Sequence, residues 1–228
     1  MPQNFNKVEL IGFYGSDETH GLSAWTSTSR DLTEEKRARI PSLLKMLASN
    51  GHETPFEKSA LHFLVTTDVA THIHILKHRI GVSVNAESAR YKELKDDKFY
   101  VPSDWDDEER ALYVDHLESS LKKYHETLER LVAKGMPRKR AKESARFYLP
   151  YGNQITADVM FNFRSFYHFV KLRYSKHAQL EVRELAHEML ALVSDLGVFD
   201  KTLAAFQLTF EEMVPHGRYV NTLREPFE

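Results

Sequence analysis

Four short segments of this 228-residue chain hold most of the side chains that could act in catalysis or ligand binding. Residues 51–57 (GHETPFE) hold a histidine, a threonine and two glutamates, and residues 77–91 (KHRIGVSVNAESARY) hold basic, hydroxyl and small side chains. In residues 144–150 (SARFYLP) and 162–179, arginines stand among aromatic residues. Aromatic side chains between basic ones suit a planar, negatively charged ligand, although each segment alone also fits a turn, a salt bridge or a hydrophobic core.

Residues 77–91 carry the clearest indication of anion binding. Lys77, His78 and Arg79 precede a run of small and polar residues that has no helical stripe. Backbone N–H groups and hydroxyls outside regular structure, placed beside arginine, form a cradle for an anion, and Gly81 would let the backbone approach it closely. The glycine spacings of a P-loop or a dinucleotide-binding fingerprint are absent from this segment. The alternative is a solvated loop with ion pairs.

Composition excludes several classes of function. The chain has no cysteine, which excludes disulfides, thiolate metal sites and a cysteine nucleophile. Lysine and arginine number 31 against 33 acidic residues, which excludes a bulk basic surface for nucleic acid. No apolar run reaches the length of a membrane span, and the N-terminus lacks the features of a secretory signal. We therefore expect a cytoplasmic protein (in the host cytoplasm if viral) that binds neither nucleic acid nor membrane.

The histidines raise the question of a metal site. His72, His74 and His78 form the densest group, and on a helix His74 and His78 would share a face as two ligands do. No acidic residue stands at a usual companion spacing, and the HExxH motif is absent. We therefore expect no metal.

Hydrophobic patterning predicts the helices and strands that carry these segments. Strands are expected over residues 8–15, 60–67 and 154–163, and a loop over residues 14–32. An apolar stripe predicts one long helix over residues 106–134. Shorter helices are expected on either side of Pro41, and this proline should end or kink the first of them. Another should begin at Pro137, and more are expected over residues 68–80, 165–174, 178–196 and 201–206. Helices outnumber strands without alternating with them, which favours an α+β fold, and no linker divides residues 1–228, so we expect a single domain.

Taken in chain order, these segments resemble the flavin-dependent thymidylate synthases, whose signature is Arg-His-Arg-x-x-Ser-x-Asn-Glu-x-Ser-x-Arg-Tyr. The sequence matches this signature at His78, Arg79, Ser83, Asn85, Ser88, Arg90 and Tyr91. Residues 51–57 resemble the block upstream of the signature, and residues 99–102 (FYVP) resemble the segment after it. Two later blocks follow in the family's order and spacing: Ala145-Arg146 with Leu149-Pro150, then Asn162, Arg164, Arg173 and His177-Ala178-Gln179. The resemblance spans roughly residues 8–185.

The signature departs from the family's pattern in several places. Lys77 stands for the first arginine, one extra residue precedes Ser83, and Ala86 stands where a glutamate is expected, with Glu87 next. Lysine keeps the charge of arginine but loses its bidentate fork. These departures keep two alternatives open. One is a relative on the same scaffold that uses flavin and folate to hydroxymethylate a deoxypyrimidine nucleotide, and the other is a non-catalytic nucleotide-binding relative.

The resemblance implies a small, mostly antiparallel sheet flanked by long helices. It implies the reductive methylation of dUMP to dTMP, in which 5,10-methylenetetrahydrofolate gives the carbon and FAD reduced by NADPH carries the hydride. The family activates uracil without an enzyme cysteine, so a chain without cysteine is compatible with it. The family is homotetrameric with sites shared between subunits, so we expect a homotetramer.

The resemblance also assigns roles to residues. Arg173 is the expected catalytic residue, a fixed guanidinium that stabilises negative charge developing on the uracil. The residues expected to bind dUMP are Arg173 with His74 (a glutamine in the family), Lys77, Glu87, Ser88, Ala89, Arg90 and Arg146. The residues expected to bind FAD are Ser29, Thr54, Lys77, His78, Arg79, Ile80, Asn162, Arg164 and His168.

Overall fold

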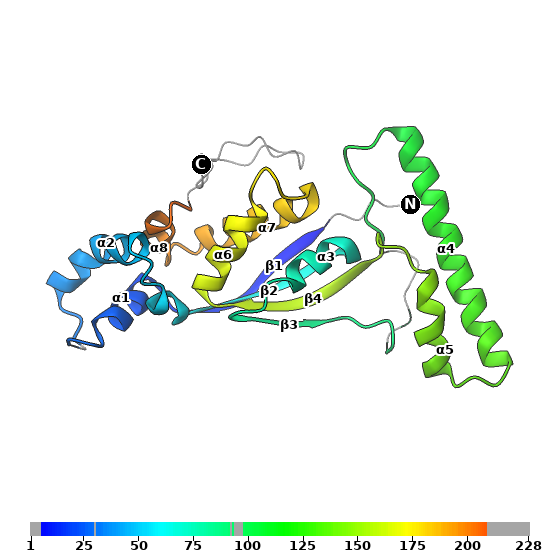
Figure 1. Cartoon of the computed structure of the whole chain (residues 1–228), viewed down its shortest axis with the longest axis horizontal. Helices are drawn as coiled ribbons and strands as arrows, with labels where there is room; N and C mark the ends of the chain where they lie inside the picture. The colour runs from blue at the N-terminus through cyan, green and yellow to red at the C-terminus, as the bar shows by residue number, and fades with distance from the viewer. Residues whose placement is uncertain (1–5, 30, 92, 94–97, 209–228) are drawn as a thin grey trace. The chain divides into compact units, whose positions relative to one another are not determined.

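A computed structural model describes residues 6–29, 31–91, 93 and 98–208 of the chain (Figure 1). The chain forms two compact units. Unit 1 comprises Met1–Lys7, Val65–Lys77 and Asn85–Ala157, and unit 2 comprises Val8–Leu64, His78–Val84 and Asp158–Glu228. Within the described ranges, no helix has the length and apolar character needed to cross a membrane. The expectation of one domain over residues 1–228 stays a prediction.

The strands form a four-stranded sheet in the order β1-β2-β4-β3. It consists of β1 (Lys7–Tyr14), β2 (Ala60–Asp68), β3 (Val82–Ala86) and β4 (Gln154–Phe161). Along β2, Leu61, Phe63 and Val65 are buried while the side chains between them are partly exposed, as expected when one face of a sheet packs on a core. The predicted α+β class with a small antiparallel sheet is confirmed.

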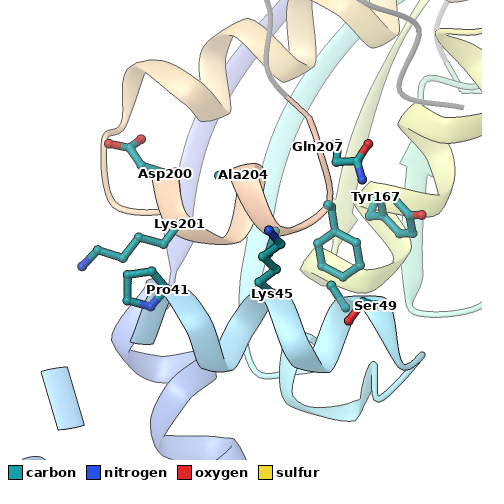
Figure 2. A pocket seen from close by; sticks show the side chains of 11 residues that line it. Pro41, Lys45, Ser49, Tyr167, Asp200, Lys201, Ala204 and Gln207 are labelled. Atoms are coloured by element: carbon teal, nitrogen blue, oxygen red, sulfur yellow. The ribbon is translucent and has the colours of Figure 1, made fainter. Parts of the chain in front are cut away.

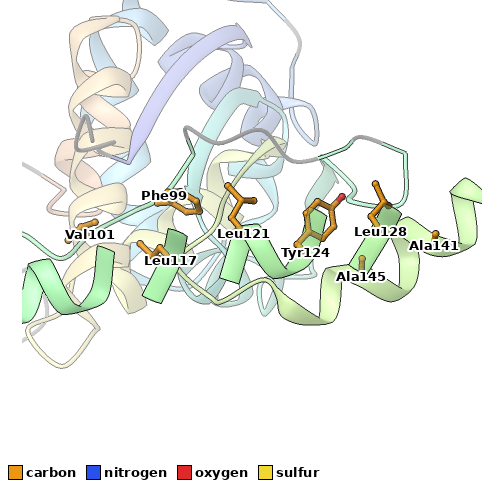
Figure 3. Packing of buried hydrophobic residues seen from close by; sticks show 8 residues of the cluster. All are labelled: Phe99, Val101, Leu117, Leu121, Tyr124, Leu128, Ala141 and Ala145. Carbon is orange, nitrogen blue, oxygen red and sulfur yellow. The ribbon is translucent and has the colours of Figure 1, made fainter. Parts of the chain in front are cut away.

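Unit 1 is built around the long helix that the sequence predicts. It contains α3 (Val69–Leu76), α4 (Asp107–Ala133), α5 (Arg138–Ala145) and the 3₁₀ turn η2 (Arg146–Tyr148). The side chain of Asp106 caps α4 by accepting a hydrogen bond from the N–H of Glu109. Buried residues of α4 pack with α5 and the segment before α4 (Figure 3): Leu117, Leu121, Tyr124 and Leu128 with Phe99, Val101, Ala141 and Ala145. The small alanines let α5 approach α4 closely, which fixes the position of η2 at the end of α5.

Unit 2 contains the remaining helices and a largely aromatic core. These helices are α1 (Asp17–Trp25), α2 (Glu34–Ser49), the 3₁₀ turn η1 (Thr54–Glu57), α6 (Phe163–Arg173), α7 (Leu180–Asp195) and α8 (Asp200–Ala205). Ring centres of Phe63 and Phe166 lie 5.9 Å apart, and those of Phe161 and Phe169 lie 5.3 Å apart. The apolar face of α6 is thereby held in the core, which leaves its polar residues for a site.

The prediction of a loop over residues 14–32 was wrong, because α1 forms there without an apolar stripe. A chain of buried hydrogen bonds holds α1 instead. Thr202 Oγ–H donates to Asp17 Oδ1 (2.7 Å), His20 Nδ1–H donates to Thr202 Oγ (3.0 Å), and Ser59 Oγ–H donates to His20 Nε2 (3.0 Å). Because the Thr202 proton goes to Asp17, the proton of the His20–Thr202 bond is on Nδ1. Burial lowers the pKa of His20 to about 4, so the ring is neutral near pH 7 and Nε2 accepts from Ser59.

Three further predictions were wrong in part. Helix α2 continues through Pro41, because the burial of Ile40, Leu44 and Leu47 outweighs the one backbone hydrogen bond that proline removes. Helix α3 ends at Leu76 rather than near residue 80. Residues 82–86, expected outside regular structure, form the edge strand β3, because their alternating exposure suits pairing with β4.

Candidate active site

Unit 1 holds a cavity of about 290 Å³ between the segment after β3, the segment after η2 and the start of β4. Several residues predicted to bind dUMP line it: Glu87, Ser88, Ala89 and Arg146. Its apolar walls come from Val69, Leu149, Pro150 and Ile155. A largely apolar cavity with a few polar groups is typical of a small-molecule site.

The charges in this cavity favour an anion. The Arg146 guanidinium has no ionic or hydrogen-bonding partner among the described residues. The Glu87 carboxylate is engaged, because it accepts the N–H of Thr156 (3.1 Å) and pairs with Lys98 Nζ (3.5 Å). Ser88 Oγ accepts the N–H of Arg90 (3.3 Å), which leaves its own proton for another acceptor. A guanidinium and a hydroxyl donor side by side suit a phosphate group.

Three other residues predicted to bind dUMP belong to unit 1 but do not line this cavity. Arg90 Nε donates to Glu143 Oε1 (2.9 Å), and the Arg90 guanidinium lies 5.5 Å from the centre of the Tyr91 ring. The hydrogen bond to Glu143 and the charge of Glu143 raise the pKa of Arg90. His74 lies in the last turn of α3, and the exposed Lys77 follows at its C-terminal end.

In unit 2, the predicted catalytic residue Arg173 is held by a histidine. Arg173 ends α6, and its Nε donates to His78 Nε2 at 2.9 Å. Burial lowers the pKa of His78 to about 4, with smaller contributions from the charges of Arg173 and His168. The imidazole is therefore neutral near pH 7, with Nε2 as an acceptor. Burial also lowers the pKa of Arg173, yet a guanidinium stays protonated in proteins, so His78 orients the charge without cancelling it.

The segment after His78 is clamped onto the N-terminus of α6. Asn162 caps the helix by accepting the N–H of Ser165 (2.8 Å), and the N–H of Asn162 donates to Gly81 O (3.1 Å). Ser165 Oγ donates to Ile80 O (2.6 Å). Gly81 has a φ of 65°, and a Cβ there would lie 2.5 Å from Asn162 Nδ2, so only glycine fits. This clamp presents Arg79 and Ile80 as exposed side chains beside α6.

Arg164 joins α6 to η1 through two carboxylates. Its Nε donates to Glu53 Oε2 (2.7 Å), and its NH1 donates to Glu57 Oε1 (2.5 Å). These hydrogen bonds, that to Glu57 first, raise the pKa of Arg164. Glu53 and Glu57 are not among the residues expected to bind FAD, although they stand on either side of Thr54 in the GHETPFE segment. The two ion pairs hold η1, and with it Thr54, beside the start of α6.

Most residues predicted to bind FAD thus belong to unit 2. They lie in three of its segments: η1, residues 78–81, and α6 together with its cap Asn162. Within the described ranges, the Thr54 hydroxyl and the Arg79 guanidinium have no partner, and such donors suit the phosphates of a dinucleotide, so this set fits FAD. Lys77 belongs to unit 1. Ser29 Oγ instead donates to Asp31 Oδ1 (2.6 Å) near the start of α2.

The histidine group of the sequence does not form on one helix. Because α3 ends at Leu76, His78 lies beyond the helix that carries His74. His74 and His78 therefore do not share a helix face, as the sequence suggested they could. Over the residues that the structure describes, no three histidine, aspartate or glutamate side chains gather as metal ligands do.

A second, larger cavity of about 780 Å³ lies in unit 2 between α2 and α8 (Figure 2). Figure 2 shows Lys45 of α2 and Ala204 of α8 on its two sides, with Tyr167 of α6 at one end. The rings of Tyr167 and Phe206 lie 4.2 Å apart. All the predicted site residues are described, and none of them lines this cavity.

Comparisons with known proteins point to one family. Residues 9–196 match the family described as "Thymidylate synthase complementing protein" (Thy1). The flavin-dependent thymidylate synthase of Clostridium tetani is 33% identical over 176 residues, which cover 72% of this chain and 69% of that protein. The enzyme of the same name from Pseudothermotoga lettingae is 32% identical over 188 residues, which cover 78% and 80%. Among solved structures, the UMP/dUMP methylase PolB from Streptomyces cacaoi bound with 5-Br dUMP matches with a TM-score of 0.75 and 26% identity, over 90% of this chain and 96% of that one.

Proposed function

Because the chain belongs to the flavin-dependent thymidylate synthase family, we propose that it methylates dUMP to dTMP. The carbon donor is 5,10-methylenetetrahydrofolate, and bound FAD, once reduced by NADPH, supplies the hydride. The observation that supports this proposal most is the cavity of unit 1. There, Arg146, whose guanidinium pairs with none of the described residues, and the Ser88 hydroxyl form an anion site at positions that match the family's motifs.

The cavity of unit 1 binds the phosphate and sugar of dUMP. Arg146 donates charge-assisted hydrogen bonds to the phosphate, and Ser88 adds a hydroxyl donor. The apolar walls, among them Leu149 and Pro150, exclude water around the sugar, which strengthens both interactions. Glu87 stays bonded to the backbone of β4 and keeps its negative charge compensated by Lys98.

Arg173 stabilises the negative charge that develops on the uracil ring. A catalytic guanidinium works best when it is already oriented before the charge appears, and the hydrogen bond to His78 supplies that orientation. His78 is neutral near pH 7, so the full charge of Arg173 acts on the substrate. The chain contains no cysteine that could add to the uracil, so activation of the ring rests on this electrostatic stabilisation.

The residues around α6 hold FAD. Thr54 and Arg79 donate to its phosphates, while Ile80 and His168 flank it. Arg164 positions η1 through Glu53 and Glu57, so its contribution to FAD binding includes the placement of Thr54. The active form is a homotetramer with sites shared between subunits. The large exposed side chains Ile80 and Phe147, each 85% exposed, support burial in such an assembly.

An anaerobic turnover experiment tests the proposed function. The purified protein is examined for a flavin absorbance spectrum and reduced with NADPH, and then dUMP and 5,10-methylenetetrahydrofolate are added. The nucleotide product is identified by mass spectrometry, and an otherwise identical reaction without folate is the control. The expected result is flavin reoxidation and dTMP formation that require both substrates.

Other results of this experiment contradict the proposal in different ways. A hydroxymethylated nucleotide would assign the chain to hydroxymethyl transfer on the same scaffold. A protein that binds dUMP but carries no flavin would be a non-catalytic nucleotide-binding relative.

A further inference from the structure

The cavity of unit 1 contains a polar side chain for which no role has been assigned. Asn153 lines the cavity and is only 3% exposed. Its Oδ1 is buried without a partner, and the whole carboxamide has none among the residues that the structure describes. Buried polar groups in folded proteins are nearly always hydrogen-bonded. An unpaired carboxamide in the wall of a cavity therefore points to a ligand that supplies the missing partners.

The backbone of Asn153 is fixed, so the side chain is preorganised for that ligand. Its N–H donates to Pro150 O (3.1 Å), and its carbonyl accepts the N–H of Val69 (3.0 Å). It also forms an antiparallel bridge with Phe99. Every backbone polar group of Asn153 is thus satisfied while its side chain is not, which separates a binding role from a role in holding the fold.

We propose that Asn153 is a substrate-positioning residue whose carboxamide hydrogen-bonds the sugar-phosphate part of the nucleotide. This inference rests on the proposed function of the same cavity. Arg146 can only donate hydrogen bonds, and the oxygens of Glu87 and Ser88 already accept from Thr156 and Arg90, so a sugar hydroxyl calls for a further acceptor. Asn153 Oδ1 supplies that acceptor, and Nδ2 supplies a donor for a phosphate or sugar oxygen. Deoxyribose 5-phosphate, with one free hydroxyl and one anionic group, complements this set.

The test uses Asn153→Leu in the FAD-loaded protein, because leucine branches at Cγ as asparagine does but has two methyl groups in place of its polar atoms. We expect the Kd for dUMP, measured by isothermal titration calorimetry, to rise about tenfold, as for one lost hydrogen bond. The KM for dUMP should rise similarly, while kcat at saturating dUMP stays within about twofold. The Tm without nucleotide should stay the same or rise, because an unpaired buried carboxamide is replaced by an apolar group.

The neighbouring residue offers a matched control. Gln154 is also buried, at 2% exposed, but its Nε2 donates to Asn6 Oδ1 (3.2 Å) and it does not line the cavity. Gln154→Met should therefore lower the Tm and leave the Kd for dUMP unchanged. Should Asn153→Leu not fold, Asn153→Ser is measured in the same way, with the same expected loss of affinity.

The outcomes separate this inference from the function on which it rests. Unchanged affinity for dUMP in the Asn153 variant, with normal binding by the wild type, overturns the role of Asn153 alone. A fall in Tm as large as that of Gln154→Met also overturns it, because the side chain would then act on the fold. Failure of the wild type to bind dUMP overturns the proposed function and, with it, this inference.

Discussion

The buried His20 should make the folded protein sensitive to mild acid. Burial lowers the pKa of His20 from 6.5 to about 4. In the folded state His20 donates to Thr202 and accepts from Ser59, so an added proton would leave the Ser59 hydroxyl without its acceptor. The unfolded chain takes up the proton near pH 6.5 and the folded chain only near pH 4. The stabilisation from neutral His20 is therefore complete above pH 6.5 and is lost as the pH falls towards 4.

The size of the effect follows from the two pKa values. They differ by about 2.5, and each pKa unit is equivalent to about 1.4 kcal/mol, so His20 contributes about 3 kcal/mol that is lost below pH 4. At pH 5 the loss is about 2 kcal/mol. A typical domain has a free energy of unfolding of about 5–15 kcal/mol, so the loss at pH 5 is measurable.

Urea denaturation at pH 7.5 and pH 5.0 measures this loss. The wild type is compared with His20→Gln, which keeps a donor and an acceptor but does not titrate. Other buried histidines, such as His78, titrate in both proteins and cancel in the comparison. The free energy of unfolding should fall by about 2 kcal/mol more in the wild type than in His20→Gln. His52→Gln makes the same change at an exposed position and should behave as the wild type. An equal fall in the wild type and His20→Gln would refute the reasoning.

Three further predictions concern the site and the core. Gly81→Ala should weaken FAD binding at least about tenfold, because its Cβ would collide with Asn162, the cap of α6. Gly51 has a similar φ of 67° but open space around its Cα, so Gly51→Ala should leave FAD binding unchanged, and equal FAD affinities of the two variants by fluorescence titration would contradict the clamp. Arg173→Lys should lower kcat for dUMP about a hundredfold or more with FAD still bound, since lysine cannot reproduce the oriented fork; a wild-type kcat would exclude the catalytic role. Leu128→Ala should lower the free energy of unfolding by about 2–5 kcal/mol, whereas Leu112→Ala, at a 59% exposed position of the same helix, should lower it by less than about 0.5 kcal/mol. Similar decreases for the two variants, measured by urea denaturation, would argue against the packing in Figure 3.

Elements whose signals are local could be predicted from the sequence. Helix α4 carries its own apolar stripe and its own cap, Asp106, so the sequence shows both its face and its start. Helix α1 could not be found in this way, because what holds it is a contact between Asp17 and Thr202, which are 185 residues apart. Pro41 is the reverse case, a local signal for a break that the burial of Ile40 and Leu44 overrides.

The candidate site shows the same division. The motifs indicate which segments take part, and the match with known relatives supports the family that they suggest. The pairing of Arg173 with His78 could not be derived from spacing, because 95 residues separate them. The contact that makes Gly81 necessary is likewise made with Asn162, on a distant segment.

The chemical groups that the protein can use are visible in its sequence: there is no cysteine for nucleophilic attack, and arginines stand in motifs that suit an anionic nucleotide. Which of these groups are available to a ligand depends on the folded structure. Arg90 and Arg146 look equivalent in the sequence, yet Arg90 forms an ion pair with Glu143, while Arg146 has no partner within the described part of the chain. Asn153 has no signal in the sequence at all, and only its burial without a partner distinguishes it. Charge compensation and desolvation depend on neighbours in space, and those neighbours come from distant parts of the chain.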